Sequence, residues 1–445
     1  MKNKHTLIIA LVLFATSLLQ PSIAQDGLNV PFSQYGIGLT DMPYNMPRAF
    51  GMGGTVYSRS SRNTVNPFNP ASYAAVESES FVFDIGINIQ NSVLRGGNSR
   101  LPGAEGSLAY LAVAFPITHW WKTSIGMLPF SIVNYESVHT LYDPLTDSDV
   151  KTVYDGNGGV TQFYWGNAFN ITPRLSFGFN VNYLYGGITR AITYQFQHND
   201  STYCMNSRSQ KNTQTSNLLF DLGLQYSQPV GAKHTLRFGA TCRLPRTSTI
   251  KDQTLAYTFL NYASTEYLFD TIFPASDQPN TYNSTLHQPL TFGLGLALER
   301  NNRWEIDLDA YYAPKGDLSY QEDPGHNIFG ATALRTTPNL RVALGYEWKG
   351  NPDASTYWGR IGLSAGLYHN HGKLALQPIG HDLTVLNETG DGLAVHLPMR
   401  KGRSLLTLAL GYSSFGDASL LRRDTFTFGI AVGSCERWFV KRKYN

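Results

Sequence analysis

The feature that most constrains this chain is an alternation of apolar and polar residues that recurs along most of its length. In residues 80–90 (SFVFDIGINIQ), every second residue from Phe81 onward is apolar, and the intervening residues after Val82, such as Asp84 and Asn88, are small or polar. Successive side chains of a β-strand point to opposite faces, so this period predicts strands with one apolar face. The same pattern returns in residues 174–185, 290–299, 304–312, 340–348, 404–413 and 425–433.

The spacing of these segments favours a membrane barrel over a soluble β-sandwich. The predicted strands, about fourteen in number, lie near residues 80–91, 106–116, 121–134, 160–171, 173–187, 216–228, 234–249, 286–299, 303–314, 338–348, 356–371, 390–399, 403–415 and 424–435. Short turns alternate with long polar segments between these strands. We predict that the long segments are loops, at residues 92–105, 135–159, 188–215, 250–285, 315–337 and 372–389. We therefore predict an all-β fold, a transmembrane antiparallel up-and-down barrel with periplasmic chain ends.

The N-terminal residues and the composition of the chain predict its location. Residues 1–24 place Lys2 and Lys4 before an apolar run and a small-x-small site, which is typical of a secretory signal peptide. The remaining chain is rich in tyrosine (26), phenylalanine (24) and glycine (41), and only 15% of all residues are charged, which suits a bacterial outer-membrane barrel. With 35 basic and 32 acidic residues, nothing indicates a nucleic-acid partner. The predicted domains are the signal peptide (1–24), an N-terminal segment (25–79), the barrel (80–435) and a periplasmic tail (436–445).

The N-terminal segment shows no alternation and contains many helix-breaking residues, as in RAFGMGGTVYS (48–58) and NTVNPFNPASYAA (63–75). Its glycines allow tight turns and close approach to another backbone, and its asparagines can bond backbone groups left open beside proline. Because fourteen strands enclose a lumen wider than their side chains fill, we predict that this segment enters from the periplasmic side as a plug. The predicted hatch motif consists of Gly51, Gly53, Gly54, Asn66, Asn69, Pro70 and Ala71.

A Gly-x-Gly-Gly stretch followed by Asn-Pro-Ala, ahead of about fourteen strands, resembles the FadL family of outer-membrane transporters for hydrophobic compounds. The resemblance covers the mature chain through its architecture, while the hatch alone carries a sequence motif. It implies a plugged barrel, a groove among outer loops, a deeper lumen site and lateral exit through the wall. It also implies passive uptake of hydrophobic or amphipathic small molecules, fatty-acid-like or aromatic. The alternative is a non-transporting structural barrel subunit of an outer-membrane secretion or protein-assembly complex.

The face opposite the lipid-facing residues carries charge into the predicted lumen. The charged residues on it are Asp84, Asp221, Arg237, Arg243, Glu305, Asp307, Asp309, Arg341 and Glu347. Opposite charges on neighbouring strands stabilise a polar lumen and can anchor a plug. The alternative is that Arg237, Arg243 or Arg341 binds a ligand carboxylate.

Two of the predicted outer loops, 188–215 and 250–285, are unusually apolar for surface loops. Their apolar residues are Tyr194, Phe196, Tyr257, Phe259, Leu260, Tyr262, Tyr267, Leu268, Phe269, Ile272 and Phe273. Three interpretations remain open: a groove for a hydrophobic ligand, a docking surface for a protein partner of an outer-membrane complex, and packing of one loop on another. Outer-membrane lipid and lipopolysaccharide are the expected surroundings of the barrel.

No motif indicates an enzyme, a metal site or a cofactor. The stretch GLSAG (362–366) matches Gly-x-Ser-x-Gly, but Ser364 falls in mid-strand where a nucleophile elbow needs a strand-to-helix turn. His369 and His371 share one strand face without a neighbouring carboxylate, which makes a poor metal site. Three scattered cysteines fit neither a disulfide framework nor a zinc site.

Overall fold

The computed structural model describes most of the chain after the predicted signal peptide. The described residues are 29–34, 36–40, 46–97, 99–144, 148–196, 205–262, 265–272, 280–300, 303–314, 319–321, 334–376, 382–399 and 403–437. The predicted signal peptide and nearly all of the predicted tail therefore lie outside them. Among the described residues, no helix has the length and apolar character needed to cross a membrane.

Strands make up nearly all of the described structure. Their bounds are β1 (Ser80–Gly96), β2 (Ser99–Pro116), β3 (Trp121–Asp143), β4 (Ser148–Asn170), β5 (Leu175–Phe196), β6 (Asn206–Val230), β7 (His234–Arg243), β8 (Arg246–Tyr262), β9 (Thr265–Ile272), β10 (Asn280–Gln288), β11 (Thr291–Arg300), β12 (Trp304–Ala313), β13 (Ser319–Gln321), β14 (Leu334–Trp348), β15 (Gly362–Leu376), β16 (Thr384–Met399), β17 (Ser404–Asp417) and β18 (Leu421–Arg437). Among the described residues, the helices are four short turns: η1 (Pro31–Gln34), α2 (Pro47–Phe50), η2 (Pro70–Ala75) and η4 (Trp358–Arg360).

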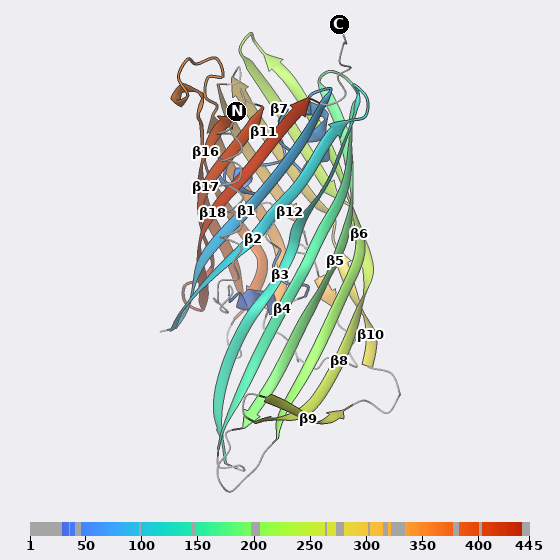
Figure 1. Ribbon diagram of the computed structural model, residues 1–445, viewed down its shortest axis with the longest axis vertical. Coiled ribbons are helices and arrows are strands. Elements are labelled where there is room, and N and C mark those ends of the chain that lie inside the picture. The colour runs from blue at the N-terminus through green and yellow to red at the C-terminus, as the bar shows by residue number, and fades with distance from the viewer. Residues whose placement is uncertain are drawn as a thin grey trace, which may run out of the picture.

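The strands close into one antiparallel barrel (Figure 1). β1 pairs with β2 on one side and with β18 on the other, which closes the ring. Each position around the barrel wall, here called a stave, is occupied by one strand or by two strands that follow each other end to end. Three staves consist of two strands each: β7 with β8, β10 with β11, and β12 with β13. Counted over the described residues, the wall has fourteen staves, so the predicted fold class is confirmed.

Two neighbouring staves bend at prolines. Pro245 separates β7 from β8, and Pro289 separates β10 from β11. A proline has no N–H for the ladder, so strands that contain it break or bend there. β7 stays paired with β11, and β8 with β10, so the two staves bend together and the lumen beside them gains a recess.

The predicted long loops are wrong over most of their length. β3, β4, β5 and β6 are 22 to 25 residues long and run through most of 135–159 and 188–215, while β8, β9 and β10 occupy much of 250–285. Outside the bilayer both faces of a strand are wet, so the sequence loses its alternation although the backbone ladder continues. The apolar residues assigned to loops therefore lie on strands, with Tyr194 on β5, Phe259 on β8 and Leu268 on β9; Phe273 lies outside the described residues.

The barrel wall has one seam. β2 and β3 pair only between Leu111–Pro116 and Lys122–Met127, although both strands continue well beyond these residues. Residues 29–34 and 36–40, here called the strap, lie along the edge of β3 that β2 leaves. The Leu39 and Ile132 backbones exchange two N–H···O bonds of 3.0 and 3.1 Å, and the Val30 N–H donates to the Asn134 carbonyl at 2.7 Å. The strap thus satisfies backbone groups that an open edge would leave without partners.

Residues 46–79, here called the hatch segment, lie within the ring. Their backbone and side chains closely approach the inward faces of β4 to β7, β11 and β14 to β18. The barrel is also lopsided: β1, β2, β17 and β18 end well before β3 to β6 and β8, which project toward the bottom of Figure 1. The opposite end carries short turns and is the periplasmic end.

Candidate functional site

The hatch segment touches the wall where the wall has no side chain. A Cβ atom added at Gly178 of β5 would lie 2.5 Å from the Pro70 carbonyl carbon and 2.6 Å from the Ala71 nitrogen. Similar close approaches occur on neighbouring staves, at Gly166, Gly223, Gly239, Gly293, Gly295, Gly345, Gly366, Gly392 and Gly429. Together with Gly178, this set, here called the glycine girdle, lets backbone and side-chain atoms of the hatch segment lie directly on the barrel wall.

The predicted Asn-Pro-Ala motif starts the short helix η2. The Asn69 side-chain oxygen accepts the Ala71 N–H at 3.1 Å, which caps the helix, and its Nδ2 donates to the Tyr57 carbonyl at 2.6 Å. Asn66 donates to the Val56 carbonyl at 2.6 Å and accepts the Phe68 N–H at 3.2 Å. Both asparagines therefore bind backbone groups within the hatch segment and fix its path.

Tyr73 anchors η2 to the wall. Its hydroxyl donates to the Asn180 side-chain oxygen at 3.1 Å, and its ring stacks on Tyr164 with centroids 6.4 Å apart. Burial raises the pKa of the Tyr73 phenol well above its usual value, because the charged form would lose its hydration. This contact therefore requires a neutral phenol.

Two predicted lumen residues hold the hatch backbone. The Asp309 carboxylate accepts the N–H groups of Val56 and Tyr57 at 2.5 and 2.9 Å. Arg341 donates to the carbonyls of Gly53 and Gly54 at 3.1 and 2.7 Å. Charge-assisted bonds of this kind contribute about 1.5–3 kcal/mol each, so these two side chains form strong attachments of the hatch segment.

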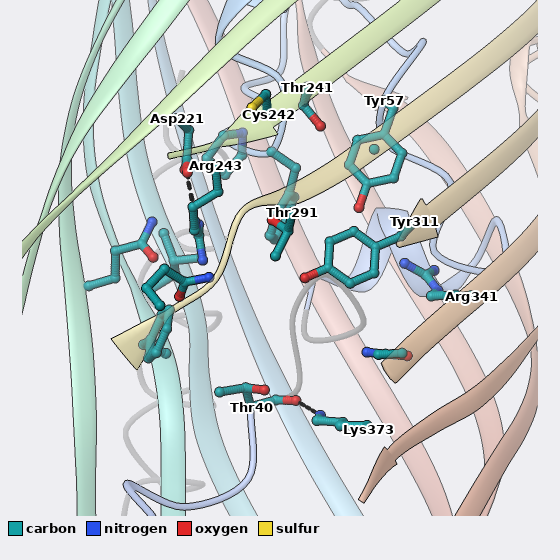
Figure 2. Close-up of a pocket in the computed structure, with 18 of the residues that line it drawn as sticks. Thr40, Tyr57, Asp221, Thr241, Cys242, Arg243, Thr291, Tyr311, Arg341 and Lys373 are labelled. Atoms are coloured by element: carbon teal, nitrogen blue, oxygen red, sulfur yellow. Dashed lines mark hydrogen bonds and ion pairs between the residues drawn. The ribbon is translucent and has the colours of Figure 1, made fainter. Parts of the chain in front are cut away.

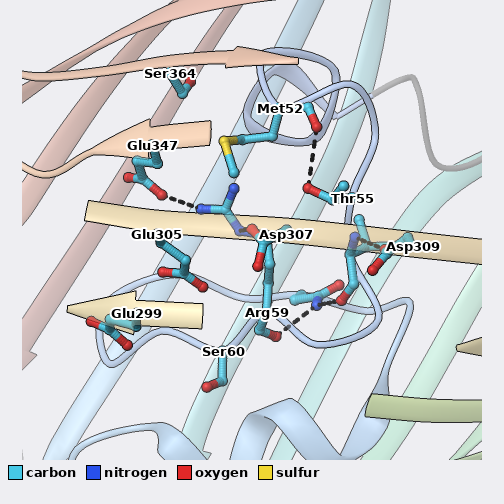
Figure 3. A network of polar contacts seen from close by, with 12 residues as sticks. Met52, Thr55, Arg59, Ser60, Glu299, Glu305, Asp307, Asp309, Glu347 and Ser364 are labelled. Atoms are coloured by element: carbon cyan, nitrogen blue, oxygen red, sulfur yellow. Dashed lines mark hydrogen bonds and ion pairs between the residues drawn. The ribbon is translucent and has the colours of Figure 1, made fainter. Parts of the chain in front are cut away.

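A buried network of charged side chains joins the hatch segment to β11, β12 and β14 near the periplasmic end (Figure 3). Arg59 of the hatch segment lies 2.5 Å from Glu347 and 3.8 Å from Asp307. Burial alone would lower the pKa of Arg59, but Glu347 and Asp307 raise it above its usual value, so the guanidinium is charged. Removing one partner of such a buried pair costs about 3–5 kcal/mol, because the other charge stays behind without a partner.

The wall completes this network. Arg237 pairs with Glu305 and lies 3.0 Å from Glu299, while Lys349 lies 2.9 Å from Glu299 and also pairs with Glu305. Farther around the ring, Asp84 accepts from Arg48 at 3.2 Å, from the Val65 N–H at 3.1 Å and from the Tyr110 hydroxyl at 2.7 Å. The structure therefore places every predicted lumen charge on the inward face and brings most of them to the hatch segment.

The recess beside the two bent staves holds a cavity of about 100 Å³, on the extracellular side of the hatch segment (Figure 2). Its apolar and aromatic lining consists of Tyr57, Pro67, Phe68, Leu128, Phe130 and Tyr311. Its polar lining consists of Thr40, Gln162, Asp221, Thr241, Cys242, Arg243, Gln288, Thr291, Asn339, Arg341, Asn370 and Lys373. We call it the lumen pocket.

The lumen pocket is electropositive. Among its described lining residues, the cations Arg243, Arg341 and Lys373 outnumber the single carboxylate of Asp221. Asp221 accepts two bonds from Arg243, at 2.6 and 3.0 Å, and the guanidinium lies 5.8 Å from the centre of the Phe130 ring. Lys373 donates to the Thr40 carbonyl of the strap. The pocket therefore offers positive charge beside an aromatic wall.

The motif resembling a nucleophile elbow lies on a strand and not at a strand-to-helix turn. Ser364 is the third residue of β15, and His396 of β16 contacts it at 3.1 Å through Nε2. The other ring nitrogen, Nδ1, contacts the Thr407 hydroxyl at 3.1 Å, and Arg48 donates to the same hydroxyl oxygen. Both ring nitrogens of His396 are thereby in hydrogen-bond contact with wall side chains, as expected for a buried polar group.

The described residues contain no group of histidine, cysteine and carboxylate side chains suited to a metal ion. His371 contacts Asn387 at 2.8 Å and, like His369, is exposed on β15. Cys242 and Cys435 are free thiols, and Cys204 lies outside the described residues.

Several residues of the site were not predicted from the sequence. Arg48 and Arg59 lie in the aperiodic hatch segment, where no pattern distinguishes an inward side chain. Leu128 and Phe130 could have been found, because they are apolar on the face of β3 opposite the lipid-exposed Ile125. Lys373 has a φ of 77° at an irregularity between β15 and its neighbours, which strand periodicity does not predict.

Comparison with known proteins gives a family and a fold. A family model described as BamG matches residues 2–445. No curated protein matches the chain. A crystal structure of a Pseudomonas aeruginosa FadL homologue superposes with a TM-score of 0.53 at 12% identity, covering 88% of this chain and 98% of that one.

Two further solved structures superpose with a TM-score of 0.50. They are the Pseudomonas putida toluene transporter TodX, at 14% identity over 92% of this chain and 100% of that one, and the Ralstonia pickettii toluene transporter TbuX, at 12% identity over 87% and 97%. At these identities the likeness establishes the fold, and the resemblance in architecture read from the sequence is confirmed.

Proposed function

The chain belongs to the BamG family, and from this premise we propose that it is an outer-membrane channel for passive uptake of small hydrophobic or amphipathic molecules. The observation that carries the proposal is the lumen pocket, whose aromatic wall and excess of cations suit a fatty-acid-like or aromatic compound with an anionic group. The hatch segment serves as the plug beneath it, and no catalytic step is part of the function. Two structural neighbours are toluene transporters, which agrees with a hydrophobic aromatic substrate.

The exit route that we propose is the seam between β2 and β3. Leu128 and Phe130 line the lumen pocket just beyond Met127, the last residue of β3 that pairs with β2. A ligand leaving the pocket there would reach the outer leaflet without crossing the hatch segment. The strap closes this route, so it must leave β3 during transport.

Ligand binding and strap release are coupled in this proposal through Lys373. Its ammonium group lines the lumen pocket and donates to the Thr40 carbonyl at the end of the strap. A ligand carboxylate competes for that ammonium group, since a charged acceptor binds it more strongly than a neutral carbonyl. An anionic ligand thereby weakens one attachment of the strap.

A disulfide between strap and wall tests the proposal. Leu39 and Ile132 exchange both backbone bonds, so their Cα atoms lie about 5.5 Å apart, within disulfide range. Leu39→Cys/Ile132→Cys, with Cys204, Cys242 and Cys435 replaced by serine, should lose uptake of a labelled fatty acid when oxidised and regain it when reduced. A matched disulfide at Val113→Cys/Ile125→Cys joins strands that are already paired and should leave uptake unchanged. Equal uptake by the oxidised and reduced strap variant would refute the route.

A second candidate, a structural barrel subunit of an outer-membrane secretion or protein-assembly complex, is favoured by the projecting part of β3. Val138, Leu141 and Tyr142 are 47%, 60% and 61% exposed there, and this part of β3 pairs with β4 but not with β2. A photo-crosslinker at Leu141, with one at the exposed periplasmic residue Tyr357 as control, should capture a defined outer-membrane partner if this candidate is correct. A monomer in mild detergent at every loading, without crosslinks from Leu141, would count against it.

A further inference from the structure

A row of arginines crosses three adjacent strands at the extracellular rim of the barrel. Arg95 of β1 is the register partner of Arg100 on β2 and of Arg422 on β18. Register partners in an antiparallel pair lie about 4.5–5.5 Å apart and share one face of the sheet. Three guanidinium groups therefore lie side by side on the outer surface, here called the arginine row.

The face that carries the arginine row is the lipid face. Phe426 of β18 and Tyr412 of β17 point the same way, with ring centroids 4.9 Å apart, and Phe426 is 60% exposed. Arg422 lies four positions before Phe426, which is about 13 Å of strand or roughly 10 Å of height at the usual tilt. An aromatic ring at the edge of the hydrocarbon places the arginine row among the lipid headgroups.

The charge of the row is not balanced by the protein. Arg95 lies 3.3 Å from the Asp424 carboxylate, and Arg422 lies 2.8 Å from its other oxygen. Among the described residues, Arg100 makes no ion pair or hydrogen bond, and Asp424 is the only carboxylate paired with the row. Like charges directly opposite each other destabilise a sheet, so three cations against one carboxylate call for a further anion.

From this arrangement we propose that the arginine row binds a phosphate group of an outer-leaflet glycolipid of the lipid A type. Arginine offers planar pairs of N–H donors that match phosphate oxygens, and it is less strongly hydrated than lysine. The half-exposed side chain of Arg95, 49% accessible, faces the lipid at headgroup height. The low rim formed by β1, β2, β17 and β18 leaves that approach open, whereas the opposite wall projects farther outward.

The arginine row lies beside the seam between β2 and β3. Arg100 belongs to the part of β2 that pairs with β1 alone, because pairing with β3 covers only Leu111–Pro116. A glycolipid held there would sit at the outer end of the seam and hold the free strand in place.

The test measures binding of purified, folded protein to three probes: bisphosphorylated lipid A, enzymatically dephosphorylated lipid A and inorganic phosphate. The variant is Arg95→Gln/Arg100→Gln/Arg422→Gln. Its control is Arg174→Gln/Lys233→Gln/Arg303→Gln, which removes the same charge from exposed residues of periplasmic turns. Heat-modifiable mobility on a gel establishes that each barrel is folded before binding is measured.

Each basic residue near an anionic lipid surface contributes about fivefold in affinity, so the triple variant should bind bisphosphorylated lipid A about a hundredfold more weakly. The control should bind it as the wild type does, and the wild type should bind dephosphorylated lipid A far less. Equal binding by the triple variant, or equal binding of the dephosphorylated lipid, would overturn the proposal. Saturation by inorganic phosphate at the same concentration as lipid A would show a site for free anions and would overturn the assignment to a lipid.

Discussion

The glycine girdle gives the most specific prediction, because one methyl group should separate the hatch segment from the wall. In Gly178→Ala, the new Cβ would lie 2.5 Å from the Pro70 carbonyl carbon and 2.6 Å from the Pro70 oxygen and the Ala71 nitrogen. Ordinary contacts between carbon atoms are about 3.5–4.0 Å, so the backbone of the Asn-Pro-Ala motif must retreat by about 1 Å. All three atoms belong to backbone and have no rotamer that relieves the overlap.

The cost of such overpacking is about 1–3 kcal/mol. This cost destabilises the docked hatch segment relative to the undocked one. The barrel wall is not affected, because the strand that contains Gly178 stays paired whether the hatch segment is docked or not. At RT of about 0.6 kcal/mol, the undocked population should rise roughly fivefold to more than a hundredfold. Gly187→Ala on the same strand is the matched control, since its Cβ would meet nothing closer than the Thr213 carbonyl oxygen at 3.9 Å.

Trypsin cleavage after Arg48 and Arg59 reports the undocked population, because cleavage of a transiently opened segment follows the equilibrium between closed and open forms. Folded barrels in detergent are mixed with trypsin, and release of the N-terminal fragment is followed over time. We expect cleavage of Gly178→Ala to accelerate by the factor above, and cleavage of Gly187→Ala to match the wild type. Equal cleavage rates in the two variants, with both barrels still heat-modifiable, would show that the hatch segment does not rest on the girdle.

Three further predictions concern the attachments of the hatch segment. Arg341→Met removes two charge-assisted bonds and should raise tryptic cleavage about a hundredfold, whereas the exposed Arg303→Met should not. Asp309→Ala leaves the buried N–H groups of Val56 and Tyr57 without their shared acceptor and should raise cleavage at least tenfold, at about 1–3 kcal/mol for each group. Burial raises the pKa of Tyr73, so its stabilisation is complete below about pH 10 and is lost as the pH rises further. Subtilisin cleavage should therefore increase above about pH 10 in the wild type, with a smaller increase in Tyr73→Phe.

The staves of the wall could be predicted from the sequence because lipid imposes a period of two. Each strand in the bilayer must present apolar side chains outward. Phe83, Leu344 and Phe426 are examples of large apolar side chains that are exposed on the outer face for this reason. Beyond the bilayer the requirement ends, and β5 continues to Phe196 through residues without alternation. Strand pairing there depends on backbone bonds, which leave no pattern in the side chains.

The inward direction of the wall charges could be predicted, but their partners could not. The alternation of side chains along a strand is enough to assign Asp309 and Arg341 to the lumen. Both side chains bind backbone groups of the hatch segment, and because every residue type has such groups, the sequence does not identify the partners. The glycines of the girdle show the same limit. Parity places Gly178 on the inner face, whereas the atoms that require it to be glycine belong to a segment more than a hundred residues away.

The two functional candidates differ in whether the strap must be released from β3. Among the described residues, six hydrogen bonds join the strap to β3: three between backbones, and three that use the side chains of Asn29, Ser33 and Ser131. At about 0.5–1.5 kcal/mol each, their loss costs roughly 3–9 kcal/mol, so the seam is open in less than about 1% of molecules at rest. A channel therefore needs a ligand that binds the open form better, and the contact of Lys373 with Thr40 provides such a coupling. A structural subunit needs no opening, and for it the same bonds serve to keep the edge of β3 from pairing with other chains. Permeability of the resting barrel should then be equally low in both cases, and ligand-dependent release of the strap is the property that separates them.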